Sequence, residues 1–541
     1  MGAPAATPEQ LDAIDAFGTG RHLVLQAGAG TGKTTALTML GASTRRTGLY
    51  VAFNKAIAVE AATRFGDNVT CRTGHALAMA AVGYRYRSRL DAPRVPTGQI
   101  GQALGVPSTV RIGRRQVSDR ALVYSATETV KRFCHSADPV IDTQHVPPLR
   151  GVESGTRHAE LADLVLPFAR AVWADLQDAE SGTAMFQHDH YLKMWALTNP
   201  VLAADFLLLD EAQDTNPVIE AVFNAQRDHA QLVLVGDSAQ AIYGWRGARD
   251  VMSGFDGITL PLSQSFRFGP VLAREANRWL AIADAPIRLE GAAGLDTTIG
   301  PVERPDVILC RTNAGAMLEL MRLLAARRRV ALVGGGGELR KLALAARDLK
   351  NGRRPGHPEL MLFAAWAEVQ EYAYDDPSGR DLLPLVDAVD QHGVDTILNA
   401  VGRLSDEAGA DVTVSTAHRA KGREWGTVRV GDDFTEPERP HRGGSAPSGP
   451  SAISAEEARV AYVAVTRARY RLDLGGLAWI NDHPQGRDPR PSVPARRPAV
   501  RDVRPSVRGR SSVAASTGPS RDPLAPSTGP VERWWRRVGR R

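Results

Sequence analysis

The stretch Leu23-Val24-Leu25-Gln26-Ala27-Gly28-Ala29-Gly30-Thr31-Gly32-Lys33-Thr34-Thr35 decides the fold of this chain. A short apolar run ends in a glycine-rich turn, and Gly32-Lys33-Thr34 then opens a predicted helix. Glycines in such a turn let backbone N–H groups close around phosphate oxygens, and the helix N-terminus adds positive potential. Lys33 is placed to reach the β- and γ-phosphates of a nucleotide, and Thr34 to hold Mg²⁺. The usual first glycine of this pattern is Ala27, so a glycine-rich turn without a ligand stays open at this point.

The overall composition excludes several classes of protein. The chain has 541 residues, of which 43% are hydrophobic and 23% charged, and this length predicts roughly two to four domains. We find no apolar run of the roughly 18–20 residues that a membrane span needs, and the N-terminus lacks a signal-peptide pattern. The three cysteines lie far apart, which predicts neither a disulfide framework nor a zinc site. We therefore expect a cytoplasmic protein with no membrane partner.

The charge is distributed unevenly. The formal net charge is +6. From residue 487 onward about 14 arginines stand against about four acidic residues, roughly +10, so the rest of the chain carries about −4. This Arg-, Pro- and Ser-rich tail cannot bury a core and is predicted to be disordered. Its end, Arg533-Trp534-Trp535-Arg536-Arg537, is a candidate site for a protein partner, nucleic acid or a lipid surface, and a solvated tail without function is the alternative.

Lysine is scarce, at seven of the 66 basic residues. Lys33 and Lys421 both fall inside candidate motifs. Because a compact ammonium is not interchangeable with a guanidinium beside phosphate, this bias indicates that these lysines carry chemistry.

A second motif is an apolar strand that ends in carboxylates, Phe206-Leu207-Leu208-Leu209-Asp210-Glu211-Ala212-Gln213-Asp214. An Asp at a strand end beside a phosphate loop can hold Mg²⁺. A following Glu is placed to polarise the attacking water. An acidic surface loop is the alternative, which the apolar lead-in and the preceding phosphate loop disfavour.

This acidic box resembles that of superfamily 1 helicases of the UvrD/Rep type. Other stretches resemble the family's motifs in the family's order: residues 27–35, 50–55, 73–75, 235–248, 262–267, 414–425 and 457–468. Alanine is usual at the first of these positions in the family, so Ala27 is no departure. Residues 188–195 also resemble the F-box DNA helicase branch, although no F-box is evident.

The alternation of short apolar runs with helical patterns predicts an α/β fold with parallel sheets. The expected strands are residues 23–26, 49–53, 69–72, 206–209 and 232–235, followed by 307–310, 330–333 and 412–414. With the resemblance, this implies two RecA-like P-loop NTPase domains with mostly α-helical inserted subdomains and a disordered basic C-terminal tail. The expected ranges are 1–75 and 196–270 for the first domain, 76–195 for its helical insertion, 271–335 and 406–480 for the second domain, 336–405 for a reduced helical insertion, and 481–541 for the tail.

The resemblance implies ATP and Mg²⁺ as cofactors. The implied catalytic residues are Lys33, Asp210, Glu211, Gln240, Arg267 and Arg467, the two arginines acting as fingers toward the γ-phosphate. The implied nucleotide-binding residues are Gln10, Ala27, Gly28, Ala29, Gly30, Thr31, Gly32, Lys33, Thr34, Thr35, Phe266 and Glu424, and Thr34 and Asp210 are the implied metal ligands. Gln10 would read the adenine edge and Phe266 would stack on adenine. The purely structural alternatives are a capping-box role for Gln10, a core position for Phe266, surface ion pairs for the arginines and an exposed helix start for Glu424.

The resemblance also implies a groove for single-stranded DNA. The implied DNA-binding residues are Phe53, Asn54, His75, Tyr243, Trp245, Arg246, Thr416 and His418. Trp245 is the strongest of them, because a base stacked on an aromatic ring is worth about 1–3 kcal/mol and needs no particular sequence. A buried tryptophan is its alternative.

The function implied is that of an ATP-dependent DNA helicase that translocates 3′ to 5′ on single-stranded DNA and unwinds duplex at junctions, in DNA repair, recombination or replication. Because the second insertion is short for this family, a single-strand translocase that displaces bound proteins and unwinds little is the alternative. A nucleotide-gated DNA-binding protein without hydrolysis is disfavoured by Glu211, Arg267 and Arg467. A helicase–nuclease fusion is disfavoured because the tail has no carboxylate-bearing strands.

Overall fold

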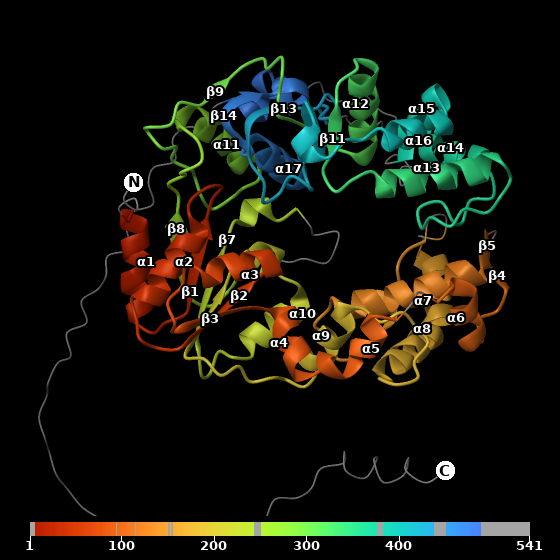
Figure 1. Cartoon of the computed structure of the whole chain (residues 1–541), viewed down its shortest axis with the longest axis horizontal. Helices are drawn as coiled ribbons and strands as arrows, with labels where there is room; N and C mark the ends of the chain where they lie inside the picture. The colour runs from red at the N-terminus through yellow and green to blue at the C-terminus, as the bar shows by residue number, and fades with distance from the viewer. Residues whose placement is uncertain are drawn as a thin grey trace, which may run out of the picture. The chain divides into compact units, whose positions relative to one another are not determined.

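The computed structural model describes residues 6–92, 95–113, 115–149, 152, 155–242, 250–375, 382–437 and 451–487. These residues form two α/β regions, each built on a six-stranded sheet, and each region carries a helical insertion (Figure 1). All the strand pairings within both six-stranded sheets are parallel. The predicted α/β class is confirmed.

The first sheet has the strand order β3-β2-β6-β7-β1-β8. Its strands are β1 (Leu23–Ala27), β2 (Gly48–Ala52), β3 (Val69–Thr73), β6 (Phe206–Leu209), β7 (Gln231–Gly236) and β8 (Ile258–Leu262). Its main helices are α1 (Pro8–Gly18), α2 (Lys33–Ala42), α3 (Lys55–Ala62) and α10 (Pro217–Asn224). The four central strands are buried along their whole length, because helices cover both faces of a parallel sheet. Five strands of this sheet were predicted from their apolar runs: β1, β2, β3, β6 and β7.

The first insertion lies between β3 and β6. It contains α4 (Gly74–Ala81), α5 (Arg87–Leu90), α6 (Thr97–Ala103), α7 (Asp119–Cys134), α8 (Gly155–Gln177) and α9 (His188–Ala196). A two-stranded antiparallel sheet of β4 (Thr109–Ile112) and β5 (Arg115–Ser118) interrupts the helices. Lys193 on α9 is buried here, with Nζ donating to the carbonyls of Ser136 and Asp138 at 2.6 and 2.7 Å. It is thus a structural lysine, unlike those of the motifs.

The second sheet has the strand order β11-β12-β10-β13-β14-β9. Its strands are β9 (Thr298–Ile299), β10 (Val307–Cys310), β11 (Val330–Leu332), β12 (Val412–Thr416), β13 (Trp425–Val430) and β14 (Ala468–Asp473), and its main helices are α11 (Pro270–Ile282), α12 (Asn313–Ala325) and α17 (Ala455–Val465). Only β10, β11 and β12 were predicted as strands. Strand β14 is exposed at three consecutive residues, so it lacks the apolar run that revealed β10, β11 and β12.

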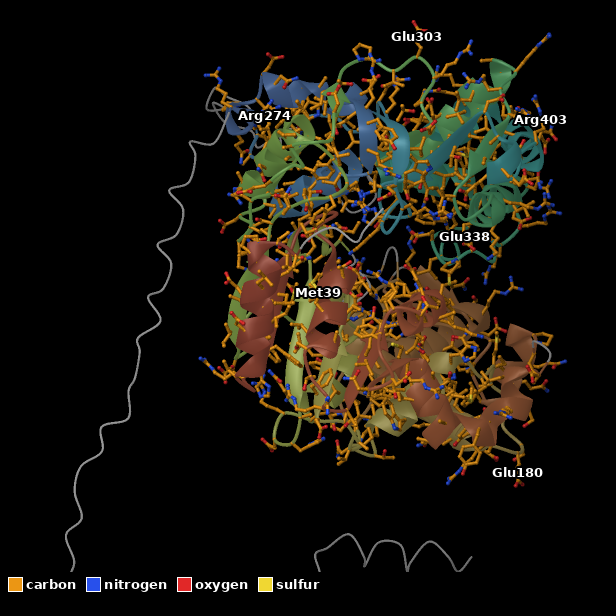
Figure 2. The ribbon with its side chains drawn as sticks, turned by 60° about the vertical axis from the view of Figure 1, so that its left-hand side comes forward. Met39, Glu180, Arg274, Glu303, Glu338 and Arg403 are labelled. Atoms are coloured by element: carbon orange, nitrogen blue, oxygen red, sulfur yellow. The ribbon has the colours of Figure 1, made fainter. Side chains whose placement is uncertain are left out.

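The second insertion consists of α13 (Gly337–Lys350), α14 (Trp366–Asp375), α15 (Leu383–His392) and α16 (Val394–Gly402). These helices share one apolar core with α12 and with β10, β11 and β12. Figure 2 shows the side chains, with Glu338 at the start of α13 and Arg403 just beyond α16. The second insertion touches the first through Arg115 and Glu368, whose Nη1 and Oε2 atoms lie 2.7 Å apart.

The packed chain extends past the predicted start of the tail at residue 481. A short 3₁₀ helix, η9 (Pro484–Gly486), packs on α11, and Arg278 donates from Nε to the carbonyl of Gly486 at 2.8 Å. Residues 6–487 belong to one compact unit. Because this unit is not divided further, the other expected domain boundaries stay predictions. The predicted disorder of 488–541 lies outside the described residues. Within the described ranges, none of the helices is both long and apolar enough to cross a bilayer.

Candidate nucleotide and DNA-binding site

The phosphate loop joins β1 to α2. Gly30 and Gly32 both have φ of 76°, in the left-handed region that favours glycine. Gly32 occupies the N-cap of α2 and has no side chain to cap the helix, so the first-turn N–H groups face the space beyond the loop. A Cβ on Gly30 would lie 2.6 Å from the Cβ of Arg267. The loop therefore needs glycine both for its turn and for the close approach of Arg267.

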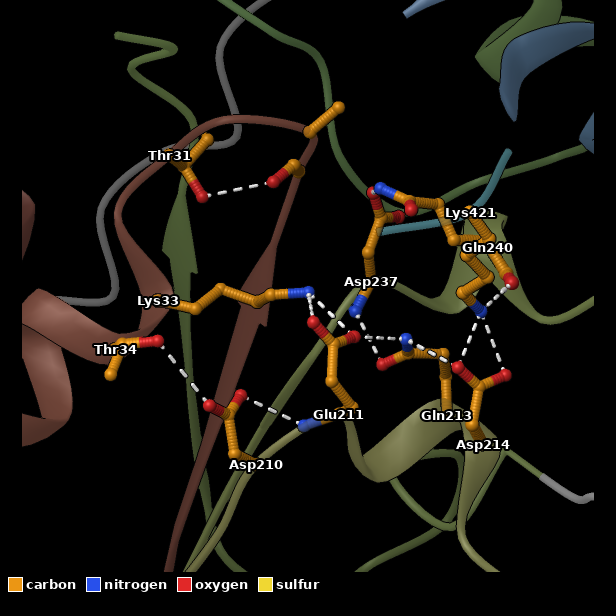
Figure 3. A network of polar contacts seen from close by, with 12 residues as sticks. Thr31, Lys33, Thr34, Asp210, Glu211, Gln213, Asp214, Asp237, Gln240 and Lys421 are labelled. Atoms are coloured by element: carbon orange, nitrogen blue, oxygen red, sulfur yellow. Dashed lines mark hydrogen bonds and ion pairs between the residues drawn. The ribbon is translucent and has the colours of Figure 1, made fainter. Parts of the chain in front are cut away.

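The acidic box follows β6 and meets the loop directly. Lys33 Nζ lies 2.7 Å from Oε1 of Glu211, and the hydroxyl of Thr34 lies 3.4 Å from Oδ2 of Asp210 (Figure 3). Tyr50 on β2 donates to the same Asp210 oxygen at 2.6 Å. Glu211 has φ of 53°, a left-handed conformation that costs a non-glycine residue of order 1–3 kcal/mol. This strained turn points the glutamate back at Lys33.

The charges of these residues depend on one another. Burial alone would raise the pKa of Glu211, but the ion pair with Lys33 outweighs it and holds that pKa at about 2. Burial alone would lower the pKa of Lys33, and Glu211 and Asp210 together raise it instead. Burial and the adjacent Glu211 charge raise the pKa of Asp210. The cluster thus holds one ammonium and an ionised Glu211 at neutral pH.

A second line of polar groups lies behind Glu211. Gln213 donates from Nε2 to Oε2 of Glu211 at 2.5 Å, and its Oε1 accepts from the backbone N–H of Asp237 at 2.9 Å. Lys421, which follows β12 in the second α/β region, forms an ion pair with Asp214 at 2.5 Å and donates to the carbonyl of Gln240 (Figure 3). The second region therefore places a lysine among the carboxylates of the first.

The two predicted arginine fingers also meet here. Arg267, after β8, donates from Nη1 to the carbonyl of Thr466 at 3.1 Å and pairs with Glu424 at 2.7 Å. Arg467, after α17, is fully buried and donates to the carbonyls of Val463 and Arg423 at 2.9 and 3.1 Å. Burial, and then the nearby Arg267 charge, lowers the pKa of Arg467 to about 9. Surface ion pairing does not describe Arg467.

These groups enclose a cavity of about 660 Å³. The predicted site residues that line it are Gly28, Gly30, Thr31, Gly32, Lys33, Thr34, Thr35, Phe53, Asn54, Glu211, Gln240, Arg267 and Arg467. Asp214, Lys421 and His135, which were not in the predicted site, line it as well. The oxygen donors of Thr34 and Asp210 suit Mg²⁺, which takes few protein ligands and completes its shell with phosphate oxygens and water.

The predicted adenine contacts flank the loop. A Cβ on Gly32 would lie 3.7 Å both from Nε2 of Gln10 and from the ring of Phe266. Phe266 is 43% exposed, so it is not a core aromatic. Gln10 does form the capping box of α1, with its Oε1 accepting from the N–H of Thr7 at 3.0 Å. The capping box uses Oε1 of Gln10, whereas the Nε2 group is the one that lies beside Gly32.

Three predicted nucleotide contacts have other partners. Ala27 is buried in the core of the first sheet, and the side chain of Ala29 packs in the core that includes α11 and α17. The N–H of Ala29 donates to the hydroxyl of Tyr462 at 3.0 Å. Glu424 pairs with Arg267 and, at 3.5 Å, with Arg469. Any role of these three in nucleotide binding stays a prediction.

The predicted DNA contacts are spread over both regions. Phe53 is 58% exposed beside the cavity, and Asn54 caps α3 by accepting from the N–H of Ile57 at 3.0 Å. His75 is the second residue of α4, and Thr416 ends β12 with His418 two residues beyond. His75, Thr416 and His418 are not among the described residues that line the cavity. Tyr243, Trp245 and Arg246 lie outside the described residues.

Sequence reasoning missed several residues of the site. Tyr462 and Lys421 lie within quoted motifs without an assigned role, and the scarcity of lysine was the signal for Lys421. Asp189 bridges two histidines, at 2.9 Å from Nε2 of His75 and 3.0 Å from Nε2 of His135. His135 and His75 are sixty residues apart in sequence, so only the fold of the insertion brings them to one carboxylate.

Comparison with known proteins agrees with this geometry. Residues 10–246 match the model of an AAA domain, and residues 385–475 match that of the UvrD-like helicase C-terminal domain. The chain is 31% identical over 505 residues to F-box DNA helicase protein 1 of Schizosaccharomyces pombe, which covers 84% of this chain and 55% of that protein. It is 28% identical over 455 residues to F-box DNA helicase 1 of Gallus gallus, covering 77% and 43%.

The chain thus spans about half the length of the relatives it matches. The two family matches occur in the order of the two α/β regions, and the predicted resemblance to the F-box DNA helicase branch is confirmed. The phosphate loop, the acidic box and the matched C-terminal region together show that this chain belongs to the UvrD-like superfamily 1 helicases.

Proposed function

We propose that this chain is a single-strand DNA-stimulated ATPase that moves 3′ to 5′ along DNA and separates duplex ahead of it. One observation carries the proposal: side chains from both α/β regions converge on one cavity. Lys33 and Glu211 come from the first region, and Lys421 and Arg467 come from the second. A nucleotide bound in this cavity would contact both regions, so its contacts would depend on the relative position of the two regions.

The chain's own groups fit ATP with Mg²⁺. The loop N–H groups and Lys33 would hold the phosphates, and Thr34 and Asp210 would hold the metal, which supplies neutralisation of phosphate charge when it is bound. Glu211 would then accept a proton from the attacking water, because Lys33, whose ion pair lowers the pKa of Glu211, would hold the phosphates instead and leave the carboxylate more basic. In the absence of phosphate, Lys33 satisfies that carboxylate instead.

Coupling to DNA would follow from closure of the two regions. Arg267 and Arg467 would gain contacts with the γ-phosphate. The two regions would approach each other when ATP binds and separate after hydrolysis. A strand held by Phe53 and Asn54 in the first region and by Thr416 and His418 in the second would be gripped alternately. The polarity and a role in repair, recombination or replication rest on the family resemblance.

A second candidate function is a translocase that displaces bound proteins and unwinds little by itself. The size and packing of the second insertion favour it, since α13–α16 share one core with the sheet. An insertion fused to its sheet in this way offers little independent surface to a duplex. Strand-displacement and protein-displacement assays on the same preparation separate the two functions.

The test of the main proposal is ATP turnover with and without an unlabelled single-stranded oligonucleotide, followed by unwinding of duplexes with 3′ or 5′ overhangs. We expect strong stimulation by the oligonucleotide and unwinding from the 3′ overhang. Turnover that is identical with and without DNA would refute the proposal, and unwinding only from a 5′ overhang would refute the polarity.

A further inference from the structure

A buried tyrosine from the second α/β region reaches into the phosphate loop of the first. Tyr462 lies on α17 and is fully buried. Its hydroxyl oxygen accepts from the N–H of Ala29 at 3.0 Å, and its O–H donates to Oδ2 of Asp237 at 2.8 Å. One hydroxyl therefore joins the phosphate loop, the end of β7 and α17.

The direction of these hydrogen bonds is fixed. Burial, and then the charge of Asp237, raises the pKa of Tyr462 well above its ordinary value, so the phenol keeps its single proton. Because the amide of Ala29 can only donate, the phenol proton goes to Asp237. The result is a one-way chain of donors that ends on a carboxylate.

Asp237 carries this contact on toward the reacting groups. Its Oδ2 also accepts from Nε2 of Gln240 at 2.7 Å, and its backbone N–H donates to Gln213 at 2.9 Å. Gln213 in turn donates to Glu211 (Figure 3). An unbroken series of hydrogen bonds thus leads from the phenol on α17 to the glutamate beside Lys33.

The C-terminal end of α17 also holds Arg467, which contacts Gln240. Arg467 follows α17, and its Nε donates to the carbonyl of Val463, the residue after Tyr462. Its Nη2 lies 3.5 Å from Oε1 of Gln240. Any shift of this end of α17 therefore acts on Gln240 both directly, through Arg467, and indirectly, through Tyr462 and Asp237.

We propose that Tyr462 is a positioning residue that transmits the position of α17 to the phosphate loop and to Asp237, and so couples DNA-induced movement of the second α/β region to ATP hydrolysis. This inference rests on the proposed function. Buried hydrogen bonds to a charged group suit such a role, because breaking them leaves both partners without compensation and they therefore form or break together.

The first experiment is Tyr462→Phe, which removes only the hydroxyl. We expect the ratio of DNA-stimulated to DNA-free turnover to fall about tenfold, as loss of a hydrogen bond to a charged group allows, while KM for ATP changes little. Tyr86→Phe is the matched control: it removes a buried hydroxyl that donates to the carbonyl of Gln177 at 3.0 Å in the first insertion, and its ratio should stay that of the wild type.

A double-mutant cycle with Asp237→Asn separates coupling from simple support of the fold. If Tyr462 acts through Asp237, the double variant is no worse in the turnover ratio than the worse single variant. A Tyr462→Phe variant with a lower melting temperature but a wild-type ratio overturns the inference, as do fully additive losses. Lack of DNA stimulation in the wild type itself would instead refute the proposed function.

Discussion

Arg467 of the second α/β region directs Nη2 at the side-chain oxygen of Gln240 in the first, across 3.5 Å. Arg467 is fully buried, and its other contacts are the carbonyls of Val463 and Arg423 and the hydroxyl of Thr466. Three of these four acceptors belong to the second region. The guanidinium is thus held in place by its own region and presented toward the cavity of the other.

The first prediction concerns this arginine. Arg467→Ala should lower kcat for ATP by about 10³-fold, the lower end of the effect of an arginine finger, with a smaller change in KM. The measurement is steady-state turnover with saturating single-stranded DNA. Arg322→Ala is the control, because Arg322 lies on α12, pairs with Glu319 of the same helix and is more than half exposed. A kcat within twofold of the wild type would exclude a transition-state role for Arg467.

The second prediction concerns the proposed general base. Glu211→Gln should lower turnover by about 10²–10⁴-fold, because the amide cannot accept a proton from water. Binding of a non-hydrolysable ATP analogue should persist, since the loop glycines and Lys33 are unchanged. Fluorescence titration with a labelled analogue gives the affinity. Glu128→Gln, on an exposed i,i+3 pair with Lys131, should behave as the wild type, and a Glu211→Gln enzyme that turns over normally would remove the glutamate from the mechanism.

The third prediction tests the adenine contact. Phe266→Ala should raise KM for ATP about tenfold, since stacking of a base on an aromatic ring is worth about 1–3 kcal/mol, and Phe266→Trp should restore it. Competitive inhibition by tripolyphosphate, which has no base, should be unaffected by either change. Tyr84→Ala removes a similarly exposed aromatic, 51% exposed in the first insertion, and serves as control. Equal loss of ATP and tripolyphosphate binding would point to a disturbed loop instead.

Local sequence was enough to predict most strands of the two six-stranded sheets and the phosphate loop, but not the contacts between regions. The apolar runs of β1 and β6 end directly at chemistry-bearing residues, so their role is visible in a few consecutive positions. Tyr462 and Lys421 act through partners that are 433 and 207 residues away. No local pattern encodes such pairs. The same applies to Asp189, whose two histidines, one on α4 and one just after α7, precede it by 114 and 54 residues.

The exposed strand β14 and the residues 481–487 were missed for a different reason. Each is held mainly by hydrogen bonds to distant elements, such as that of Arg278 to Gly486. Both segments are polar, and residues 481–487 also contain Pro484, so neither has the apolar run that predicts a buried element.

The last prediction concerns stability at low pH. His190 on α9 is buried, and its Nδ1 accepts from the N–H of Gln187 at 3.0 Å, which closes the capping box of that helix. A protonated Nδ1 could not accept this bond. Burial lowers the pKa of His190 from 6.5 to about 4. In the unfolded chain the imidazole takes up its proton near pH 6.5, whereas in the folded chain it does so only near pH 4.

The neutral His190 therefore makes its full contribution to the free energy of unfolding above pH 6.5, and this contribution is lost as the pH falls toward 4. The loss should be on the order of 2–3 kcal/mol in the free energy of unfolding. His190→Gln keeps an acceptor at the same capping-box position without a titrating group, so its unfolding free energy should fall less over this window. Urea unfolding at several pH values between 4 and 7 measures both slopes, and His392→Gln, at an exposed histidine, should keep the wild-type slope. Identical slopes for the wild type and His190→Gln would show that His190 is not the group whose protonation weakens the fold.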